Sequence, residues 1–346
     1  MEKSVLVVGS GLAGLTLGYH LQKSGAKVTI VDDGVNHSSR VAAGMINPIV
    51  FRRVNKGWRV DEFIPYLQAF YRELESAVGA SFFHPVQIRR MFSNEHEREL
   101  WLKKQALPEY EPFLSTVTPE DDAYDRAINN FGSGRVKQAA YVKTDVFLDS
   151  TREWMRNKCI VLNEVFDFSE LTGLSYKGTQ YDDLVFCEGY RGKDNPFFGN
   201  LPLNQTKGET LVIKASFLPE DESVNRKCFI LPMGDHHFKV GSTYEWSCTD
   251  LSITDKGREQ ILEKVSYLTT QSVEVVEQEA GIRPTTEDRR PLMGTHHTHE
   301  HYHIFNGLGT KGYLLAPKLA SEMAHYILGK GNLNPEATIE RFYRKR

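Results

Sequence analysis

The chain has 346 residues, of which 40% are hydrophobic and 25% are charged, and its formal net charge is −3. This length exceeds what one ordinary hydrophobic core needs, so we expect two domains of a globular protein. The small negative charge does not favour a nucleic-acid partner, and no apolar run is long enough to span a membrane.

The start of the chain and its cysteines lead us to expect a cytoplasmic location. The first predicted strand begins within a few residues of Met1, which leaves no space for a signal peptide. The cysteines are few, scattered and without a C-x-x-C pair, so we expect free thiols at Cys159, Cys187, Cys228 and Cys248.

A βαβ unit with a glycine-rich turn is predicted at the amino terminus. An apolar strand over 5–8 leads into the turn Gly9-Ser10-Gly11-Leu12-Ala13-Gly14, a helix over 12–23 and a strand over 27–31 that ends at Asp32. The glycines permit a tight turn, close approach of the backbone to a pyrophosphate and close helix packing. The helix N-terminus favours phosphate, and the acid is placed for ribose hydroxyls. This order of elements predicts a dinucleotide site.

Short helices and strands follow as far as about residue 200. Residues 36–40 are predicted to form a polar turn. Apolar spacing predicts helices over 61–78, 95–105 and 145–156. Strands are predicted over 87–92, 159–162 and 184–187, the last of which stops at Glu188-Gly189.

The last part of the chain returns to alternating patterns. Antiparallel strands are predicted over 210–214, 228–231 and 238–241, with a helix over 257–268 across them. A strand over 301–305 enters the turn 307–312, which opens a helix over 313–328. We therefore expect an α/β fold with a discontinuous nucleotide-binding domain and a second domain built on a mostly antiparallel sheet with flanking helices.

The residues at four separate places resemble the D-amino-acid oxidase/glycine oxidase family of FAD-dependent amine oxidoreductases. The matching segments are the first turn with Asp32, then Ala42–Met45, Leu184–Gly189, and Gly281-Ile282-Arg283-Pro284 with the turn Gly307–Gly312. The resemblance implies a Rossmann-like FAD-binding domain of residues 1–82, 141–200 and 283–346, with residues 83–140 and 201–282 forming the substrate domain.

The resemblance also implies which residues hold the cofactor, which we expect to be non-covalent FAD because no cysteine matches the pattern of covalent attachment. These residues are Gly9, Gly11, Leu12, Ala13, Gly14, Asp32, Asp33, Ser39, Arg40, Ala43, Gly44, Met45, Val165, Glu188, Gly189, Arg283, Gly309, Thr310, Lys311, Gly312 and Tyr313. Residues 38–40 are equally consistent with a polar surface turn. The N-terminus of the last helix suits the N1–C2=O side of a flavin, where negative charge accumulates on reduction.

The family pattern assigns the substrate carboxylate to Arg283, because a guanidinium forms two parallel hydrogen bonds with a carboxylate. An ion pair between Arg283 and Glu279 is the alternative. The implied reaction transfers a hydride from the substrate Cα–H to flavin N5 and releases an imine that hydrolyses, with oxygen or another acceptor taking the electrons. Two positions differ from glycine oxidases: Phe229 replaces a tyrosine, and Thr310 replaces an arginine for which the adjacent Lys311 can substitute.

Three other functions remain open. The turn Gly307–Gly312 is similar to one in the oxidase half of the bifunctional enzyme that matures 5-aminomethyl-2-thiouridine in tRNA, and Arg52, Arg53, Lys56 and Arg59 form a basic cluster. The net charge argues against that tRNA function. A flavin-binding module without turnover is the second, and a nicotinamide dehydrogenase, which would leave Ala42–Met45 unexplained, is the third.

A run of histidines between Thr295 and His303 has the composition of a metal site. It lies between two predicted strands, and zinc sites need converging ligands with supporting hydrogen bonds. We therefore expect a hairpin tip with its imidazoles in water and no metal. A second hairpin tip is predicted at His236-His237.

Overall fold

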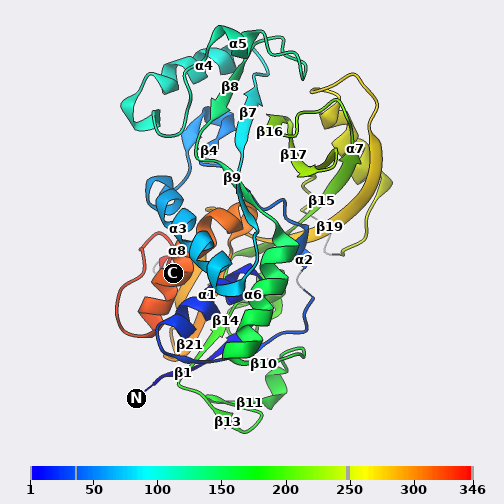
Figure 1. The fold of residues 1–346 in the computed structure, drawn as a ribbon. Coiled ribbons are helices and arrows are strands. Elements are labelled where there is room, and N and C mark those ends of the chain that lie inside the picture. Colours follow the sequence, from blue (N-terminus) through cyan, green and yellow to red (C-terminus); the bar gives the residue numbers. More distant parts are fainter. Residues whose placement is uncertain (1, 36, 247–249, 344–346) are drawn as a thin grey trace.

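The computed structural model describes residues 2–35, 37–246 and 250–343 (Figure 1). A six-stranded sheet with the order β10-β2-β1-β14-β21-β20 lies in the lower part of Figure 1. All neighbouring strands are parallel except the last pair, which is antiparallel. The strands come from three separate stretches of chain: β1 Ser4–Val8 and β2 Lys27–Val31; β10 Ile160–Leu162 and β14 Asp183–Phe186; β20 Leu292–Thr295 and β21 Tyr302–Asn306.

The central strand β1 shows why the strands of this sheet are continuous apolar runs in the sequence. Successive side chains of a strand point to opposite faces. Val5 and Val7 pack into one core cluster, while Leu6 and Val8 pack into another on the opposite face. Because both faces are covered, every position of the strand favours an apolar residue.

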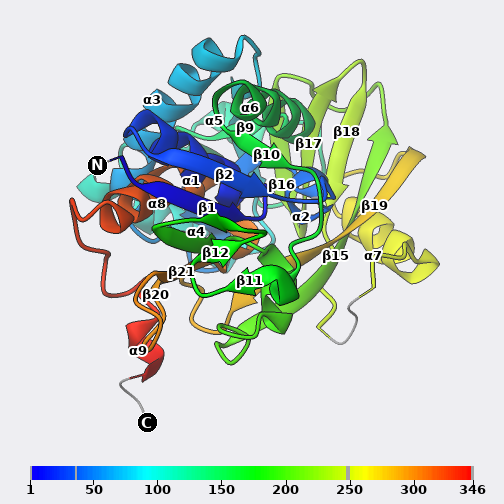
Figure 2. The same cartoon turned by 90° about the horizontal axis from the view of Figure 1, so that it is seen from below.

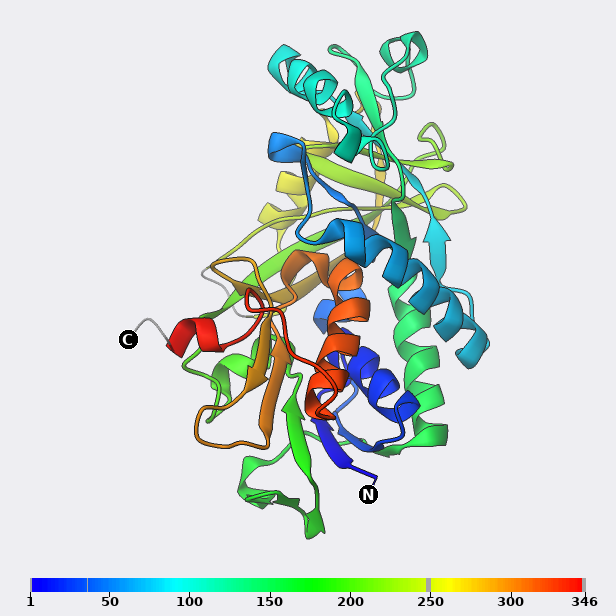
Figure 3. The same cartoon turned by 90° about the vertical axis from the view of Figure 1, so that its left-hand side faces the viewer.

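Four helices form the layer on one face of the sheet; in Figure 3, α8, α1 and α6 lie side by side and α3 crosses them obliquely, packed on α8 and α6. They are α1 Leu12–Lys23, α3 Val60–Val78, α6 Thr144–Lys158 and α8 Gly312–Ile327. The other face is covered by a small meander of β11 Leu171–Thr172, β12 Ser175–Tyr176 and β13 Thr179–Gln180, whose Tyr176 belongs to the core on that side.

A seven-stranded sheet with the order β19-β15-β18-β17-β16-β7-β8 forms the second layer. Only the pairing of β16 with β7 is parallel. Figure 2 shows α7 Asp255–Val265 beside β15 and β19. The strands are β7 Gln87–Met91, β8 Ser133–Val136, β15 Leu203–Lys214, β16 Glu222–Arg226, β17 Cys228–Gly234, β18 His237–Gly241 and β19 Glu274–Thr286.

Short elements join and extend the two sheets. The strands are β3 Met45–Ile46, β4 Ile49–Val50, β5 Asn55–Lys56, β6 Phe83–Pro85 and β9 Ala140–Val142. The helices are α2 His37–Val41, α4 Glu95–Gln105, α5 Pro119–Asp122 and α9 Glu340–Tyr343, and the 3-10 turns are η1 Phe51–Arg53, η2 Pro108–Tyr110, η3 Phe168–Glu170, η4 Gly189–Asp194 and η5 Gly309–Lys311.

The fold class predicted from the sequence is confirmed, and each predicted helix ends within three residues of its predicted bounds. In the seven-stranded sheet β8, β16 and β19 were not predicted, and neither were the short strands β3 to β6, β9 and β11 to β13. Residues 37–41, expected in a polar turn, form the short helix α2. The domain boundaries remain predictions, and β19 runs through the one expected at residue 283. Within the described part of the chain, we find no helix both long and apolar enough to cross a membrane.

Candidate active site

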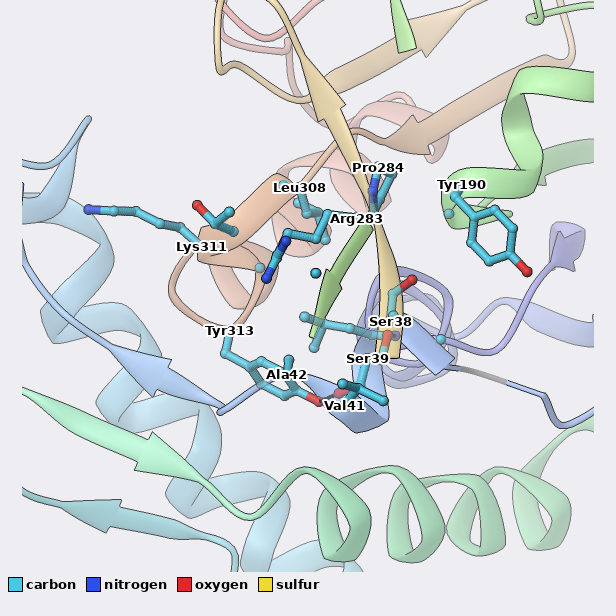
Figure 4. Close-up of a pocket in the computed structure, with 18 of the residues that line it drawn as sticks. Ser38, Ser39, Val41, Ala42, Tyr190, Arg283, Pro284, Leu308, Lys311 and Tyr313 are labelled. Atoms are coloured by element: carbon cyan, nitrogen blue, oxygen red, sulfur yellow. Dashed lines mark hydrogen bonds between the residues drawn. The ribbon is translucent and has the colours of Figure 1, made fainter. Parts of the chain in front are cut away.

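A cavity of about 770 Å³ opens where the carboxyl ends of the parallel strands meet the seven-stranded sheet. Val8, Val31, Cys187 and Asn306 lie at or directly after the ends of β1, β2, β14 and β21, and all four line it. Ligands of open α/β sheets bind at this edge. The opposite wall comes from the second sheet and includes Phe229 and Arg283. Figure 4 shows Arg283 in the cavity.

The first glycine turn packs tightly against the end of β14. Gly9 has a φ of +100°, which favours glycine, and a Cβ atom there would lie 2.6 Å from the Cys187 carbonyl oxygen. A Cβ atom at Gly14 would lie 1.8 Å from the Gly9 carbonyl oxygen. These contacts agree with the tight turn and close packing predicted for the two glycines. Leu12 N–H, in the first turn of α1, donates to Ser39 Oγ (3.1 Å).

Asp32 is fixed at the end of β2 by backbone N–H groups and an arginine. Its carboxylate accepts from the backbone N–H groups of Ser10 and Gly34, both at 2.7 Å. Arg152 of α6 donates to the same carboxylate at 3.0 Å and to Ser10 Oγ at 2.6 Å. Arg152 was not predicted, because its contact with Asp32 spans 120 residues of sequence. The neighbouring Asp33 accepts from Arg191 (2.8 Å), and this pair also lines the cavity.

The segment around Gly44 brings the backbone close to β9. Gly44 has a φ of +65°, and a Cβ atom there would lie 2.0 Å from the Val142 carbonyl oxygen. The Gly44 carbonyl accepts from Val142 N–H (3.0 Å), and Met45 pairs with Tyr141 in the adjoining strand. Any larger residue at position 44 would push this segment into the cavity that it lines.

Glu188 lies at the carboxyl end of β14 with its carboxylate buried. Burial raises its pKa to about 7, partly opposed by the hydrogen bond from Asn195 Nδ2, and the nearby Asp194 charge raises it further. That hydrogen bond measures 2.6 Å. The side chain therefore carries a proton over part of the neutral range.

The glycine turn after β21 brings the start of α8 against the glycine turn of residues 9–14. A Cβ atom at Gly312 would lie 2.8 Å from Leu12 Cδ2, and the buried Tyr313 hydroxyl donates to the Ser39 carbonyl (2.9 Å). Lys311 donates to the Asn47 carbonyl at 3.4 Å, and burial lowers its pKa to about 8. In Figure 4 its side chain extends away from Arg283.

Arg283 projects from β19 into the second half of the cavity. Its Nη2 donates to Ser242 Oγ (2.8 Å), and its guanidinium carbon lies 4.7 Å from the Tyr244 ring centre. Burial lowers its pKa. The alternative pairing with Glu279 is wrong, because Glu279 accepts from Lys239 at 2.7 Å. Across the described ranges, no ion pair joins Arg283 to a carboxylate.

The cavity brings together nearly all the predicted site residues. The residues that line it are Gly9, Gly11, Leu12, Ala13, Asp32, Asp33, Ser39, Ala43, Gly44, Met45, Val165, Glu188, Gly189, Phe229, Arg283, Gly309, Thr310, Lys311, Gly312 and Tyr313. Gly14 lies behind the first turn. Arg40 is not among the lining residues and its guanidinium instead donates to Asp149 (3.2 Å).

The cavity fits FAD on three counts. Its volume lies in the range of sites for large ligands. Glycines stand at positions 9 and 44, where a Cβ atom would collide with backbone. The N-terminal ends of α1 and α8 both reach it, and these ends favour phosphate groups and reduced-flavin charge.

The family model described as DAO, FAD dependent oxidoreductase, matches residues 4–326 of the chain. The chain belongs to this family. This DAO-family protein is therefore an enzyme, an FAD-dependent oxidoreductase, as the sequence predicted.

Individual relatives match over nearly the whole chain. The enzyme is 24% identical to the glycine oxidase of Bacillus licheniformis, over 99% of this chain and 96% of that protein. The glycine oxidase structure from Geobacillus kaustophilus has a TM-score of 0.79 at 20% identity, covering 96% of each chain. The iminodiacetate oxidase (IdaA) structure from Chelativorans sp. BNC1 has a TM-score of 0.79 at 17% identity, covering 96% of this chain and 99% of that one. These structures establish the shared fold.

Two of the four residues in the basic cluster of this DAO-family oxidoreductase are neutralised by acidic neighbours. Lys56 contacts Asp61 (2.6 Å), and Arg59 contacts Glu62 and Glu322, both at 2.6 Å. Arg52 lines the cavity, while Arg53 is exposed outside it. These ion pairs do not favour a docking site for tRNA, which stays an untested alternative.

The prediction that the histidine tip is spread into water is partly wrong. The run does form the turn between β20 and β21, but His296 and His303 are buried. His303 Nε2 lies 3.1 Å from the Asp183 carboxylate, and its Nδ1 lies 2.9 Å from Thr295 Oγ1. Polar partners from a distant strand therefore hold the ring inside. Among the described residues, no group of side chains could hold a metal ion.

Several residues of the site were missed because they follow no local motif. Tyr190 and Arg191 line the cofactor half, and Ser242, Tyr244 and Lys264 line the substrate half. Of the cysteines, Cys159, Cys187 and Cys228 carry free thiols, and Cys248 lies outside the described residues.

Proposed function

We propose that this enzyme oxidises the carbon–nitrogen bond of a small amino acid or an N-substituted glycine. The observation that carries the proposal is the half-buried guanidinium of Arg283, which faces the cavity without a carboxylate partner among the described residues. A buried cation is costly unless an anion accompanies it. A substrate carboxylate supplies that anion in a bidentate geometry that suits arginine.

The named relatives support the same class of reaction. Two of them are a glycine oxidase and an iminodiacetate oxidase, and the substrates in both names are amines with a carboxylate. When bound, FAD would supply the acceptor for a hydride from the carbon next to the amine, which would leave an imine for water to hydrolyse. For this step the protein has to fix distance and orientation.

The residues of this chain divide the work between binding and positioning. Arg283 holds the carboxylate, while Phe229 forms an apolar wall beside it. Lys311 also lines the cavity, but its ammonium group donates to the Asn47 carbonyl and extends away from Arg283, so it does not reach the amine of a substrate held there (Figure 4). Only the neutral amine can release a hydride from the adjacent carbon.

We infer that FAD is held without a covalent bond. Burial raises the thiol pKa of both Cys187 and Cys228, the two cysteines that line the cavity, and so disfavours the reactive thiolate. Acid precipitation should release the yellow colour into the supernatant. Colour that stays in the pellet would contradict this inference.

The proposed function is tested by replacing Arg283, the residue that holds the substrate carboxylate. Arg283→Ala removes two charge-assisted hydrogen bonds to the substrate, so kcat/KM for a carboxylate-bearing amine should fall by about two to four orders of magnitude. FAD content should stay near that of the wild type. Arg53→Ala, an exposed arginine outside the cavity, serves as the control. Unchanged kcat/KM in Arg283→Ala would remove the assignment.

A further inference from the structure

We propose that Lys264 anchors a second anionic group of the substrate, so that the preferred substrate is an amine with two carboxylates. This inference rests on the proposed amine oxidation and adds the substrate class. It comes from the arrangement of charge in the half of the cavity that the seven-stranded sheet lines.

Lys264 and Arg283 reach the same residue from different elements. Lys264, on α7, donates from Nζ to the Ser242 carbonyl oxygen (2.9 Å). Arg283, on β19, donates to Ser242 Oγ (2.8 Å). Both side chains line the cavity. The two cationic groups are therefore separated by a single residue, which is the spacing that two carboxylates of one small molecule can bridge.

Neither cation is neutralised by the protein. Among the described residues, no carboxylate forms an ion pair with Lys264 or Arg283, and Lys264 is half-buried. The remaining cations of this wall differ: Arg90 is paired with Glu97 (2.7 Å), and Lys227 is exposed. One substrate carboxylate would balance one of the two unpaired charges. The second charge, half-buried at the cavity wall, is then available to a second anion.

The acidic residues of the cavity lie elsewhere. Those that line it are Asp32, Asp33, Glu164 and Glu188, which follow β2, β10 and β14 at the edge of the parallel sheet. The wall that carries Lys264 and Arg283 contributes no acidic lining residue from the described ranges. The cavity is thus divided into an acidic cofactor half and a cationic substrate half.

The second anchor differs from the first in its chemistry. Lys264 offers a compact ammonium group on a flexible stem, without the planar fork of an arginine, and this suits a carboxylate on a flexible arm.

The test compares two substrates that differ in one terminal group. Iminodiacetate and N-ethylglycine share the N-substituted glycine unit and differ in whether the second arm ends in a carboxylate or a methyl group. For the holoenzyme, kcat/KM should favour iminodiacetate by roughly 10- to 100-fold, the effect of one hydrogen bond to a charged group. In Lys264→Met this ratio should fall toward one. Lys256→Met, an exposed lysine on the same helix, should keep the wild-type ratio.

Each outcome decides a different claim. Equal kcat/KM for the two compounds in the wild type, or the wild-type ratio retained in Lys264→Met, would overturn the second subsite while leaving amine oxidation in place. If neither a small amino acid nor an N-substituted glycine reduces the bound flavin, the proposed function itself fails. Because the wild-type comparison needs no variant, instability of Lys264→Met would not prevent the test.

Discussion

Gly208→Ala is expected to displace Arg283 without touching the cofactor. Gly208 lies in β15 directly opposite Gly281 of β19, and a Cβ atom there would lie 2.0 Å from Arg283 Nη1 and 2.3 Å from Cζ. Real Cβ atoms stay at least 3.0 Å from such neighbours, so the guanidinium must move by about 1 Å or more. The guanidinium is the free end of a flexible side chain, and its shift therefore needs little rearrangement of the sheet.

A misplacement of about 1 Å at a group that orients the substrate can cost about 100-fold in rate. We therefore expect kcat/KM for a carboxylate-bearing amine to fall by about that factor, while FAD content and thermal stability stay near wild type. Steady-state kinetics and flavin absorbance measure both. Gly331→Ala, whose Cβ atom would make an ordinary 3.6 Å contact with His325, is the control. Wild-type kinetics in Gly208→Ala would refute the positioning of the guanidinium by Gly208.

Two further predictions concern the cofactor half. Burial raises the pKa of Glu188 to about 7 in the folded protein, against 4.5 in the unfolded chain, so the folded protein binds more protons at this carboxyl group. The contribution of Glu188 to the free energy of unfolding therefore falls as the pH rises between these two values. Glu188→Gln should stabilise the FAD-free protein by up to about 3 kcal/mol above pH ~7 but not below pH ~4.5. Urea unfolding at two pH values measures this, and equal gains at both would contradict it. Arg152→Met removes the guanidinium that donates to Asp32 and Ser10, and should raise the Kd for FAD by roughly tenfold. Fluorescence titration of the FAD-free protein with FAD measures this Kd. Undiminished affinity would show that Arg152 does not position Asp32.

The features that were predicted correctly depend on residues that lie close together in the sequence. The turn from Gly9 to Gly14, the strand ending at Asp32 and the helices follow from local spacing, because glycine, helix period and strand alternation act over a few residues. Arg283 could be assigned because it stands in a short motif that resembles a known family.

The features that were missed depend on contacts between distant parts of the chain. β19 was not predicted, because it carries several charged residues and Pro284 at the edge of its sheet, where a missing N–H is tolerated. His303 was expected in water, yet Asp183, separated from it by 120 residues, holds it inside. Lys264 and Arg152 likewise belong to the site only through tertiary packing, which no local pattern encodes.

Anaerobic reduction of the bound flavin tests the central claim most directly. The enzyme is mixed without oxygen with matched pairs of compounds, each an N-alkyl glycine or small amino acid and the same amine without its carboxylate. We predict that the carboxylate-bearing members bleach the flavin absorbance and that their partners do not. Equal bleaching by both members of a pair, or none by any compound, would contradict the account.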